Sequence, residues 1–166
     1  RIPDSVLGNG YLLVKTDFDN RQPETDETDN VYQAIAIKVT RPNLVVTDFT
    51  APTIAGSGQY ITASWTVQNQ GDVDTYNGWY DRVVYSVDNV WGNDDDVYLG
   101  EYYGSGLAVN GSYTSSPSLR IPDSVLGNGY LLVKTDFDNR QPETDETDNV
   151  YQAIAIKVTR PNLVVT

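Results

Sequence analysis

The sequence feature that most constrains the fold of this chain is an internal repeat. Residues 1–47 recur without a single change as residues 120–166, at an offset of 119 residues. A period this long is a whole domain rather than one turn of a solenoid, whose repeats have roughly 20 to 50 residues. We therefore predict one complete unit at residues 43–161, the C-terminal part of a preceding unit at residues 1–42, and the start of the next at residues 162–166.

Two other origins of this repeat remain open. A two-domain protein with one duplication would give the same pattern, and so would an artefact of cloning. Identity over 47 consecutive residues favours recent or constrained repetition. The preferred interpretation is therefore a longer tandem array of domains, each with its own core.

The complete unit has the pattern of an all-β domain, because short alternating segments are separated by turns and no helical period is present. Seven strands are predicted, at residues 43–51, 59–70, 79–87, 97–103, 112–121, 130–136 and 150–158. The last two are predicted to be the final two strands of the preceding unit as well. Seven strands in a unit of 119 residues suit a two-sheet, immunoglobulin-like Greek-key β-sandwich.

The alternation within single strands predicts which side chains face the core. In the second strand one face carries Ile61, Ala63, Trp65 and Val67, which is typical of a half-buried strand with Trp65 in the core. The same reasoning predicts buried faces formed by Val83, Tyr85 and Val87 in the third strand and by Val150, Ile154, Ile156 and Val158 in the seventh. Pro117 indicates that the fifth strand lies at an edge or is bulged.

Composition excludes several classes of function. The chain has no Cys and no Met or His, so it can form no disulfide, no common nucleophilic triad and no zinc site of the usual kind. Paired carboxylates or a metal-bound water would be the remaining catalytic groups, and carboxylates in flexible loops are expected to be solvated. We predict that the domain is not an enzyme.

The net charge of −12 makes nucleic acid and anionic membrane surfaces poor partners. The sequence has no apolar stretch of about 20 residues, so it predicts no membrane insertion of this fragment. The complete unit carries 16 acidic and 6 basic residues. Repulsion at this density opposes a compact fold unless cations compensate, so divalent metal is a physical expectation.

Acidic residues are densest between the last two predicted strands. Six carboxylates and two asparagines lie within fourteen residues and are opposed by one arginine: Asp136, Asp138, Asn139, Glu143, Asp145, Glu146, Asp148 and Asn149. Calcium takes about six to eight oxygen ligands and tolerates irregular geometry, so such a loop can wrap one ion. The glycine and terminal glutamate of an EF-hand are missing. The first copy supplies the equivalents of the first seven: Asp17, Asp19, Asn20, Glu24, Asp26, Glu27 and Asp29.

A second acidic loop joins the third and fourth strands. Its candidate metal ligands are Asp88, Asn93, Asp94, Asp95 and Asp96, and a thinner third group is Asp72, Asp74 and Asp81. The alternative for every group is a solvated loop closed by local Asx turns.

The sequence resembles the CARDB family of bacterial immunoglobulin-like or fibronectin-like domains. The matching segments are NLVVTDFTAP (43–52), ITASWTVQNQGD (61–72), WYDRVVYSVDN (79–89), DDDVYLG (94–100), GNGYLLVKTDFDN (127–139) and ETDETDNVY (143–151). The resemblance covers nearly the whole unit and implies a secreted or surface protein of bacterial type. It implies no catalytic residue, because such domains share a fold rather than an activity.

These observations predict a calcium-stabilised structural repeat of an extracellular bacterial filament, stalk or giant adhesin, whose partner is itself through neighbouring repeats or subunits. The alternative is a carbohydrate- or ligand-binding module, with surface glycans as the candidate partner, because the chain has three Trp and twelve Tyr. Aromatic residues adjacent along a strand, such as Trp79 and Tyr80, point to opposite faces and cannot form one sugar-stacking platform. An array of identical units also favours mechanical reach over a single recognition site.

Overall fold

The structure is a computed structural model that describes residues 2–3 and 5–164. The chain divides into two compact units, residues 1–40 and residues 41–166. The predicted start of a further repeat, residues 162–166, lies partly outside the described residues, as does part of the predicted segment 1–42. Strands, turns and loops account for every described residue. Accordingly, the described part of the chain contains no helix long and apolar enough to cross a membrane.

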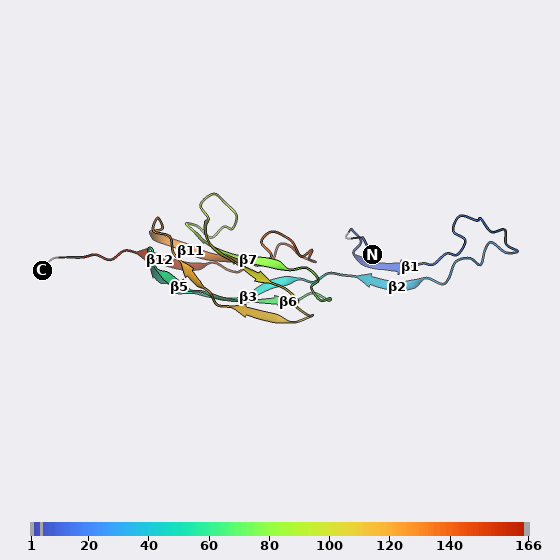
Figure 1. Ribbon diagram of the computed structural model, residues 1–166, viewed down its shortest axis with the longest axis horizontal. Helices are drawn as coiled ribbons and strands as arrows, with labels where there is room; N and C mark the ends of the chain where they lie inside the picture. The colour runs from blue at the N-terminus through green and yellow to red at the C-terminus, as the bar shows by residue number, and fades with distance from the viewer. Residues whose placement is uncertain (1, 4, 165–166) are drawn as a thin grey trace. The chain divides into compact units, whose positions relative to one another are not determined.

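The second unit is a β-sandwich of two layers (Figure 1). The five-stranded sheet has the order β4 (Ile54–Gly56), β12 (Ile154–Thr159), β11 (Gly127–Lys134), β7 (Trp79–Ser86) and β8 (Val97–Gly104). The three-stranded sheet has the order β3 (Leu44–Thr50), β6 (Ser64–Asn69) and β9 (Ser112–Ser115), and a short pair is formed by β5 (Tyr60–Thr62) and β10 (Ser118–Arg120). All pairs are antiparallel except β4 with β12. The prediction of an all-β, immunoglobulin-like sandwich is confirmed.

The core between the sheets follows the alternation of the strands. Ile61, Ala63, Trp65 and Val67 are all buried, as predicted, and Trp65 has no exposed surface. The indole of Trp65 packs edge-on against the ring of Tyr102, with 5.3 Å between ring centroids. From the other sheet, Trp79, Val83, Leu131 and Val133 are also fully buried.

Two strand ends differ from the sequence prediction. Val87 was expected on the buried face but is 62% exposed, because β7 ends at Ser86 and the carboxylate of Asp95 accepts from the Val87 amide at 2.9 Å. Val150 was expected on the buried face at the start of the last strand but is 36% exposed. It forms an isolated bridge with Lys134 instead, and the regular ladder of β12 starts at Ile154.

Two short features refine the predicted strands. The fifth strand is interrupted at Pro117 into β9 and β10, as the sequence indicated. Strand β4 was missed, since a segment of three residues carries no readable alternation. It arises because the chain leaves the three-stranded sheet around Pro52 and pairs in parallel with β12 of the five-stranded sheet.

The first unit is a hairpin of β1 (Gly8–Leu12) and β2 (Ile35–Val39). Its pairing, Gly8 with Val39 through Leu12 with Ile35, is the pairing of β11 with β12 shifted by 119 residues. The identical sequence therefore forms the same hairpin in both units. What differs is burial: Leu12 is 50% exposed, whereas its equivalent Leu131 is fully buried.

Candidate metal centre

The loop between β11 and β12, residues 135–153, begins with a tight turn centred on Asp136. Asp136 and Asn139 adopt positive φ angles of 42° and 52°, and the amide of Asn139 donates to the carbonyl of Asp136 at 2.9 Å. Short polar side chains tolerate this backbone conformation better than other non-glycine residues. The Asp136 carboxylate also accepts from the amides of Arg140 and Gln141, at 2.8 and 2.9 Å. The turn therefore fixes a buried carboxylate in place.

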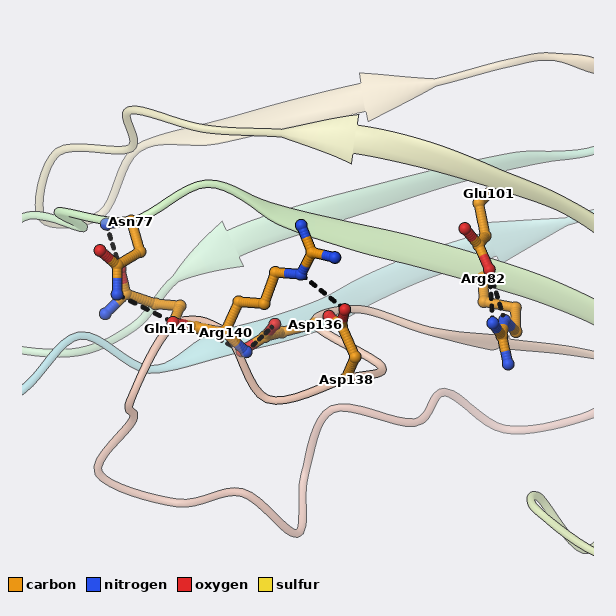
Figure 2. Close-up of polar contacts among 7 residues, drawn as sticks. All are labelled: Asn77, Arg82, Glu101, Asp136, Asp138, Arg140 and Gln141. Atoms are coloured by element: carbon orange, nitrogen blue, oxygen red, sulfur yellow. Dashed lines mark hydrogen bonds and ion pairs between the residues drawn. The ribbon is translucent and has the colours of Figure 1, made fainter.

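Gln141 ties this turn to the neighbouring β6–β7 loop, residues 70–78. Its side chain is fully buried, and Oε1 accepts from the amides of Tyr76 and Asn77 at 3.0 and 2.9 Å. Figure 2 shows Gln141 beside Asn77, and Arg140 beside Asp136 and Asp138. Both loops lie at the end of the sandwich where β3 begins (Figure 1).

Three carboxylates of the β11–β12 loop converge on one point. Oxygen atoms of Asp136, Glu143 and Glu146 all lie within 4.8 Å of one another. Two oxygens on opposite sides of a calcium ion are about 4.6 to 5.2 Å apart, since each bond is about 2.3 to 2.6 Å long. The three oxygens can therefore bind one ion. These three residues are called the metal centre below.

Burial and mutual repulsion disfavour three charges at the metal centre in the absence of a cation. Asp136 and Glu143 are 0% and 2% exposed, and Glu146 is partly exposed. Burial raises the pKa of Glu143 to about 8, against hydrogen bonds from Leu44 and Asn149 that lower it, and the charges of Glu146 and Asp136 raise it further. Burial raises the pKa of Asp136 as well, with Glu146 adding repulsion. A bound cation would offset both effects.

Several oxygens around the metal centre lack a hydrogen-bond donor. Asn149 is 1% exposed, and its Nδ2 donates to Glu143 Oε1 at 2.8 Å, while its Oδ1 has no partner. Glu146 Oε2 and Asp148 Oδ1 are also buried without a donor. Buried polar atoms without partners are rare in folded proteins and often indicate an ion or a water. The donor set, all carboxylate and amide oxygen, fits a hard cation such as calcium.

The remaining candidates of this loop have other partners. Asp138 forms an ion pair with Arg140 at 2.6 Å, and Asp145 accepts from the amide and hydroxyl of Thr147. Asp148 accepts from the Asn43 side chain through one oxygen. Asn139 serves the turn through its backbone. The structure thus brings together three of the predicted ligands and leaves the others around them.

The first copy of the loop has the same local geometry. Oxygens of Asp17, Glu24 and Glu27 also lie within 4.8 Å of one another, and all three are more exposed than their equivalents. Asp17 accepts from the amides of Arg21 and Gln22, as Asp136 does from Arg140 and Gln141. The other candidates lie outside this trio. Asp19 forms an ion pair with Arg21, and Asp26 accepts a hydrogen bond from the Thr28 amide. Asn20 has a positive φ angle, and Asp29 is exposed.

The β7–β8 loop is closed mainly by local hydrogen bonds. Asp88 accepts hydrogen bonds from the Val90 amide at 2.8 Å and from the Asn93 side chain. Asp95 accepts one from the Ser86 hydroxyl at 2.7 Å, and Asp96 accepts one from the Gly92 amide at 2.7 Å. Asp94 is exposed. In the described part of the chain the acidic trios are those at Asp136 and Asp17, and this loop forms none. These hydrogen bonds are those of local Asx turns, but Asn93 Oδ1 and Asp96 Oδ1 are buried without a donor, so the metal prediction for this loop stays a prediction.

Asp81 was grouped with Asp72 and Asp74 in the sequence, but it lies in the core. It is fully buried and accepts from Trp65 Nε1 at 2.6 Å, Tyr113 OH at 2.5 Å and Thr135 Oγ1 at 2.7 Å. Its alternation with Val83 and Tyr85 along β7 was the signal that could have placed it there. Burial raises the pKa of Asp81, and the hydrogen bonds from Tyr113, Trp65 and Thr135 oppose that shift.

The aromatic residues divide between the two faces, as the alternation predicts. Trp79 and Tyr102 pack inward, whereas Tyr80 and Tyr103 pair on the outer face with 5.3 Å between ring centroids. The guanidinium of Arg140 lies over the Tyr80 ring at 4.8 Å. The outer pair meets edge to face, at an interplanar angle of 63°.

Solved structures resemble the fold. The crystal structure of the CARDB domain of the PF1109 protein from Pyrococcus furiosus, in complex with di-metal ions, has a TM-score of 0.56 at 15% identity and covers 75% of this chain and 100% of that chain. The solution structure of the same domain has a TM-score of 0.54 at 18% identity and covers 72% and 97%. A domain from Methanosarcina acetivorans, described as part of a cell surface protein, has a TM-score of 0.49 at 21% identity and covers 72% and 93%.

At these identities the two Pyrococcus furiosus structures show a shared fold. The comparison with curated proteins found no match. The family comparison is independent of the structure: the CARDB family model matches residues 41–153, which is more than half of the chain. The chain belongs to the CARDB family.

Proposed function

We propose that the chain is part of a structural repeat protein of the bacterial cell surface or extracellular space, in which calcium at the β11–β12 loop stabilises each domain. The observation that carries the calcium site is the convergence of Asp136, Glu143 and Glu146 within 4.8 Å in a largely buried position. The di-metal complex of the Pyrococcus furiosus CARDB domain supports metal binding on this fold. A surface location is what membership of the CARDB family implies.

A structural role without catalysis is supported by the surroundings of the acidic groups. Each carboxylate of the metal centre accepts hydrogen bonds from the protein itself. Asp136 accepts from the amides of Arg140 and Gln141. Glu143 accepts from the Leu44 amide and the Asn149 side chain, and Glu146 accepts from the Glu143 amide. These bonds hold the loop rather than present a group to a substrate. An ion here would therefore stabilise the fold.

Calorimetry with calcium and with a chelator tests the calcium site. A ligand that binds the folded state alone stabilises it by about 2.7 kcal/mol at a hundredfold excess over Kd. Extracellular calcium modules bind at roughly 10⁻⁴ to 10⁻³ M, so the melting temperature should rise in millimolar calcium and much less in magnesium. Glu146→Gln should remove this response from the unfolding transition of the second unit, because the trio of Asp17, Glu24 and Glu27 is left intact. Asp48→Asn, a change of an exposed carboxylate on β3, should keep it. Identical melting curves of the unmodified chain in calcium and chelator would refute the calcium site.

The tandem arrangement and self-association are supported by the hairpin of the first unit. Leu12 and Val14 are 50% and 68% exposed, whereas their equivalents Leu131 and Val133 are fully buried against the rest of the sandwich. An isolated two-stranded hairpin is marginally stable in water. We therefore propose that residues 1–42 are completed by the missing five strands of the same repeat, supplied by a longer chain or by a neighbouring subunit.

Adding a copy of residues 43–119 in front of residue 1 tests this completion. The extended chain should fold as two sandwiches, and the amides of β1 and β2 should gain protection from hydrogen exchange equal to that of β11 and β12. The 166-residue chain should show weak protection of the first hairpin or should associate in sedimentation experiments. A stable monomer with full protection of both hairpins would contradict the proposal.

A further inference from the structure

We propose that a divalent cation in the metal centre fixes residues 41–44, the leading segment through which the chain enters the sandwich, and so controls the stiffness of the joint before each repeat. This inference rests on the proposed calcium site. It concerns a different property, the mobility of the chain outside the domain. It follows from contacts within residues 41–149.

The same loop that forms the metal centre contacts the leading segment. Thr144 lies between the candidate ligands Glu143 and Glu146 in the sequence. Its amide donates to the carbonyl of Pro42 at 3.0 Å, and its hydroxyl donates to the carbonyl of Arg41 at 3.0 Å. The Arg41 guanidinium donates to the carbonyl of Glu143 at 3.4 Å. The backbone of Arg41 and Pro42 is therefore held by residues next to the candidate ion site.

A second set of contacts continues along the segment. The amide of Asp145 donates to Asn43 Oδ1 at 2.9 Å, and Asn43 Nδ2 donates to Asp148 Oδ2 at 2.9 Å. The Leu44 amide donates to Glu143 Oε2, a carboxylate of the metal centre itself. Asn149, whose Nδ2 reaches Glu143, also donates to the carbonyl of Leu44 at 3.3 Å. One carboxylate thus belongs both to the candidate ion site and to the start of β3.

The physical link is the repulsion between the carboxylates. Without a cation, Asp136, Glu143 and Glu146 cannot all be charged in this buried position without repulsion, which favours opening of the loop between residues 143 and 146. Opening moves Thr144 and with it the bonds to Arg41 and Pro42. A cation draws the three carboxylates together and holds Thr144 against the leading segment.

The end of the domain provides an internal control, because the leading segment has an identical copy there. Residues 159–162 repeat the sequence Thr-Arg-Pro-Asn of residues 40–43. At this end the Thr159 carbonyl accepts from the Ser57 amide at 2.9 Å, and the Arg160 side chain donates to the carbonyl of Asp123. Neither partner belongs to the β11–β12 loop. Metal should therefore affect the mobility at residue 40 and leave that at residue 159 unchanged.

Spin labels at the two equivalent positions test the inference. The chain has no cysteine, so Thr40→Cys and Thr159→Cys each give a single attachment site in the full chain. Titration with calcium should remove the fast-motion component of the electron paramagnetic resonance spectrum of the label at residue 40. The spectrum of the label at residue 159 should not change.

Two further variants separate this inference from the calcium site. Thr144→Val removes the hydroxyl that reaches the Arg41 carbonyl and none of the candidate ligands, so calcium affinity measured by calorimetry should stay the same while the immobilisation at residue 40 weakens. Glu146→Gln should remove both the immobilisation at residue 40 and the binding step of the metal centre, while the trio of Asp17, Glu24 and Glu27 keeps its own binding step. Calcium binding without any change at residue 40, or equal changes at both labels, would overturn the inference and leave the calcium site standing. Absence of calcium binding to the unmodified chain would overturn both.

Discussion

Replacing Asp81 is the sharpest test of how the core of the sandwich is held together. Its carboxylate accepts from three donors at once, Trp65 Nε1, Tyr113 OH and Thr135 Oγ1, at 2.5–2.7 Å. Trp65 and Thr135 have no exposed surface, so neither donor can turn to bulk water. Tyr113 is partly exposed, and its hydroxyl also accepts from Trp79 Nε1 at 3.2 Å.

Asp81→Ala leaves the two fully buried donors without an acceptor. At about 1 to 3 kcal/mol for each buried donor left unpaired, the free energy of unfolding should fall by roughly 2 to 6 kcal/mol. Asp81→Asn should cost far less, because the amide can reproduce the network. Its oxygen can accept from Trp65 and Tyr113, and its NH₂ group can donate to the hydroxyl of Thr135. We expect a change of about 1 kcal/mol or less, since no buried group then lacks a partner.

The pH dependence of the same pair of proteins separates geometry from charge. Burial raises the pKa of Asp81 above its usual 3.8, so just above that pH the folded protein holds a proton that the unfolded chain has released. The contribution of this proton to stability is complete below pH 3.8 and is lost as the pH rises through the folded-state pKa. The unmodified protein should therefore lose stability relative to Asp81→Asn as the pH rises above 4 (about the unfolded pKa).

Urea denaturation followed by tryptophan fluorescence, measured across this pH range, gives all of these values. Asp48→Asn, on the exposed face of β3, is the matched control for loss of one negative charge. The acceptor geometry would be refuted if Asp81→Ala and Asp81→Asn lost the same stability. A difference between the unmodified protein and Asp81→Asn that does not change with pH would refute the raised pKa.

Two pairs of equivalent residues give further predictions, because each substitution can be made in both copies of the same hairpin. Leu131→Ala should lower the free energy of unfolding by about 2 to 5 kcal/mol, whereas Leu12→Ala should lower it little in the 166-residue chain. Equal losses in denaturation experiments would show that the first hairpin is already packed in a core. Gly129→Ala should cost about 1 to 3 kcal/mol, because its Cβ would lie 2.3 Å from the Tyr85 hydroxyl and 2.5 Å from the Ser86 carbonyl. Gly10→Ala should be neutral by the same measurement, since a Cβ there meets nothing within 4 Å, and a destabilised Gly10→Ala would contradict the exposed hairpin.

The sequence predicts the strands well because burial in a sandwich follows a period of two residues. The alternation placed Trp65 in the core and Tyr80 on the opposite face from Trp79, and the structure has both. Where a side chain contact overrides the alternation, the prediction was wrong. The Asp95 carboxylate accepts from Ser86 and Val87 and turns the chain out of β7, which no pattern within the strand could reveal.

The candidate site was only partly predictable from sequence. Acidic density correctly drew attention to the β11–β12 loop, but it could not separate Glu143 and Glu146, which converge, from Asp138 and Asp145, which bind neighbouring groups. It named Asn149 among the oxygen-bearing residues but could not show that its amide oxygen lacks a donor, because that is a property of packing. Asp81 shows the opposite error, since a charge in an alternating strand was read as part of an acidic cluster although its face of β7 is buried.

The two copies of the acidic loop separate what the local sequence determines from what the domain adds. Both copies form the Asp136-type turn and the converging trio, so this geometry is encoded within the loop itself. The burial of Glu143 is not encoded within the loop, because its equivalent Glu24 is exposed. In the second unit the leading segment supplies the Leu44 amide to Glu143, and Asn149 bridges that carboxylate to the Leu44 carbonyl. A cation in the buried copy interacts with its ligands at a lower local dielectric than one in the exposed copy, so the buried copy should bind more tightly. Calcium affinity would then report whether a repeat is complete, and the two copies in one chain should titrate in two separate steps.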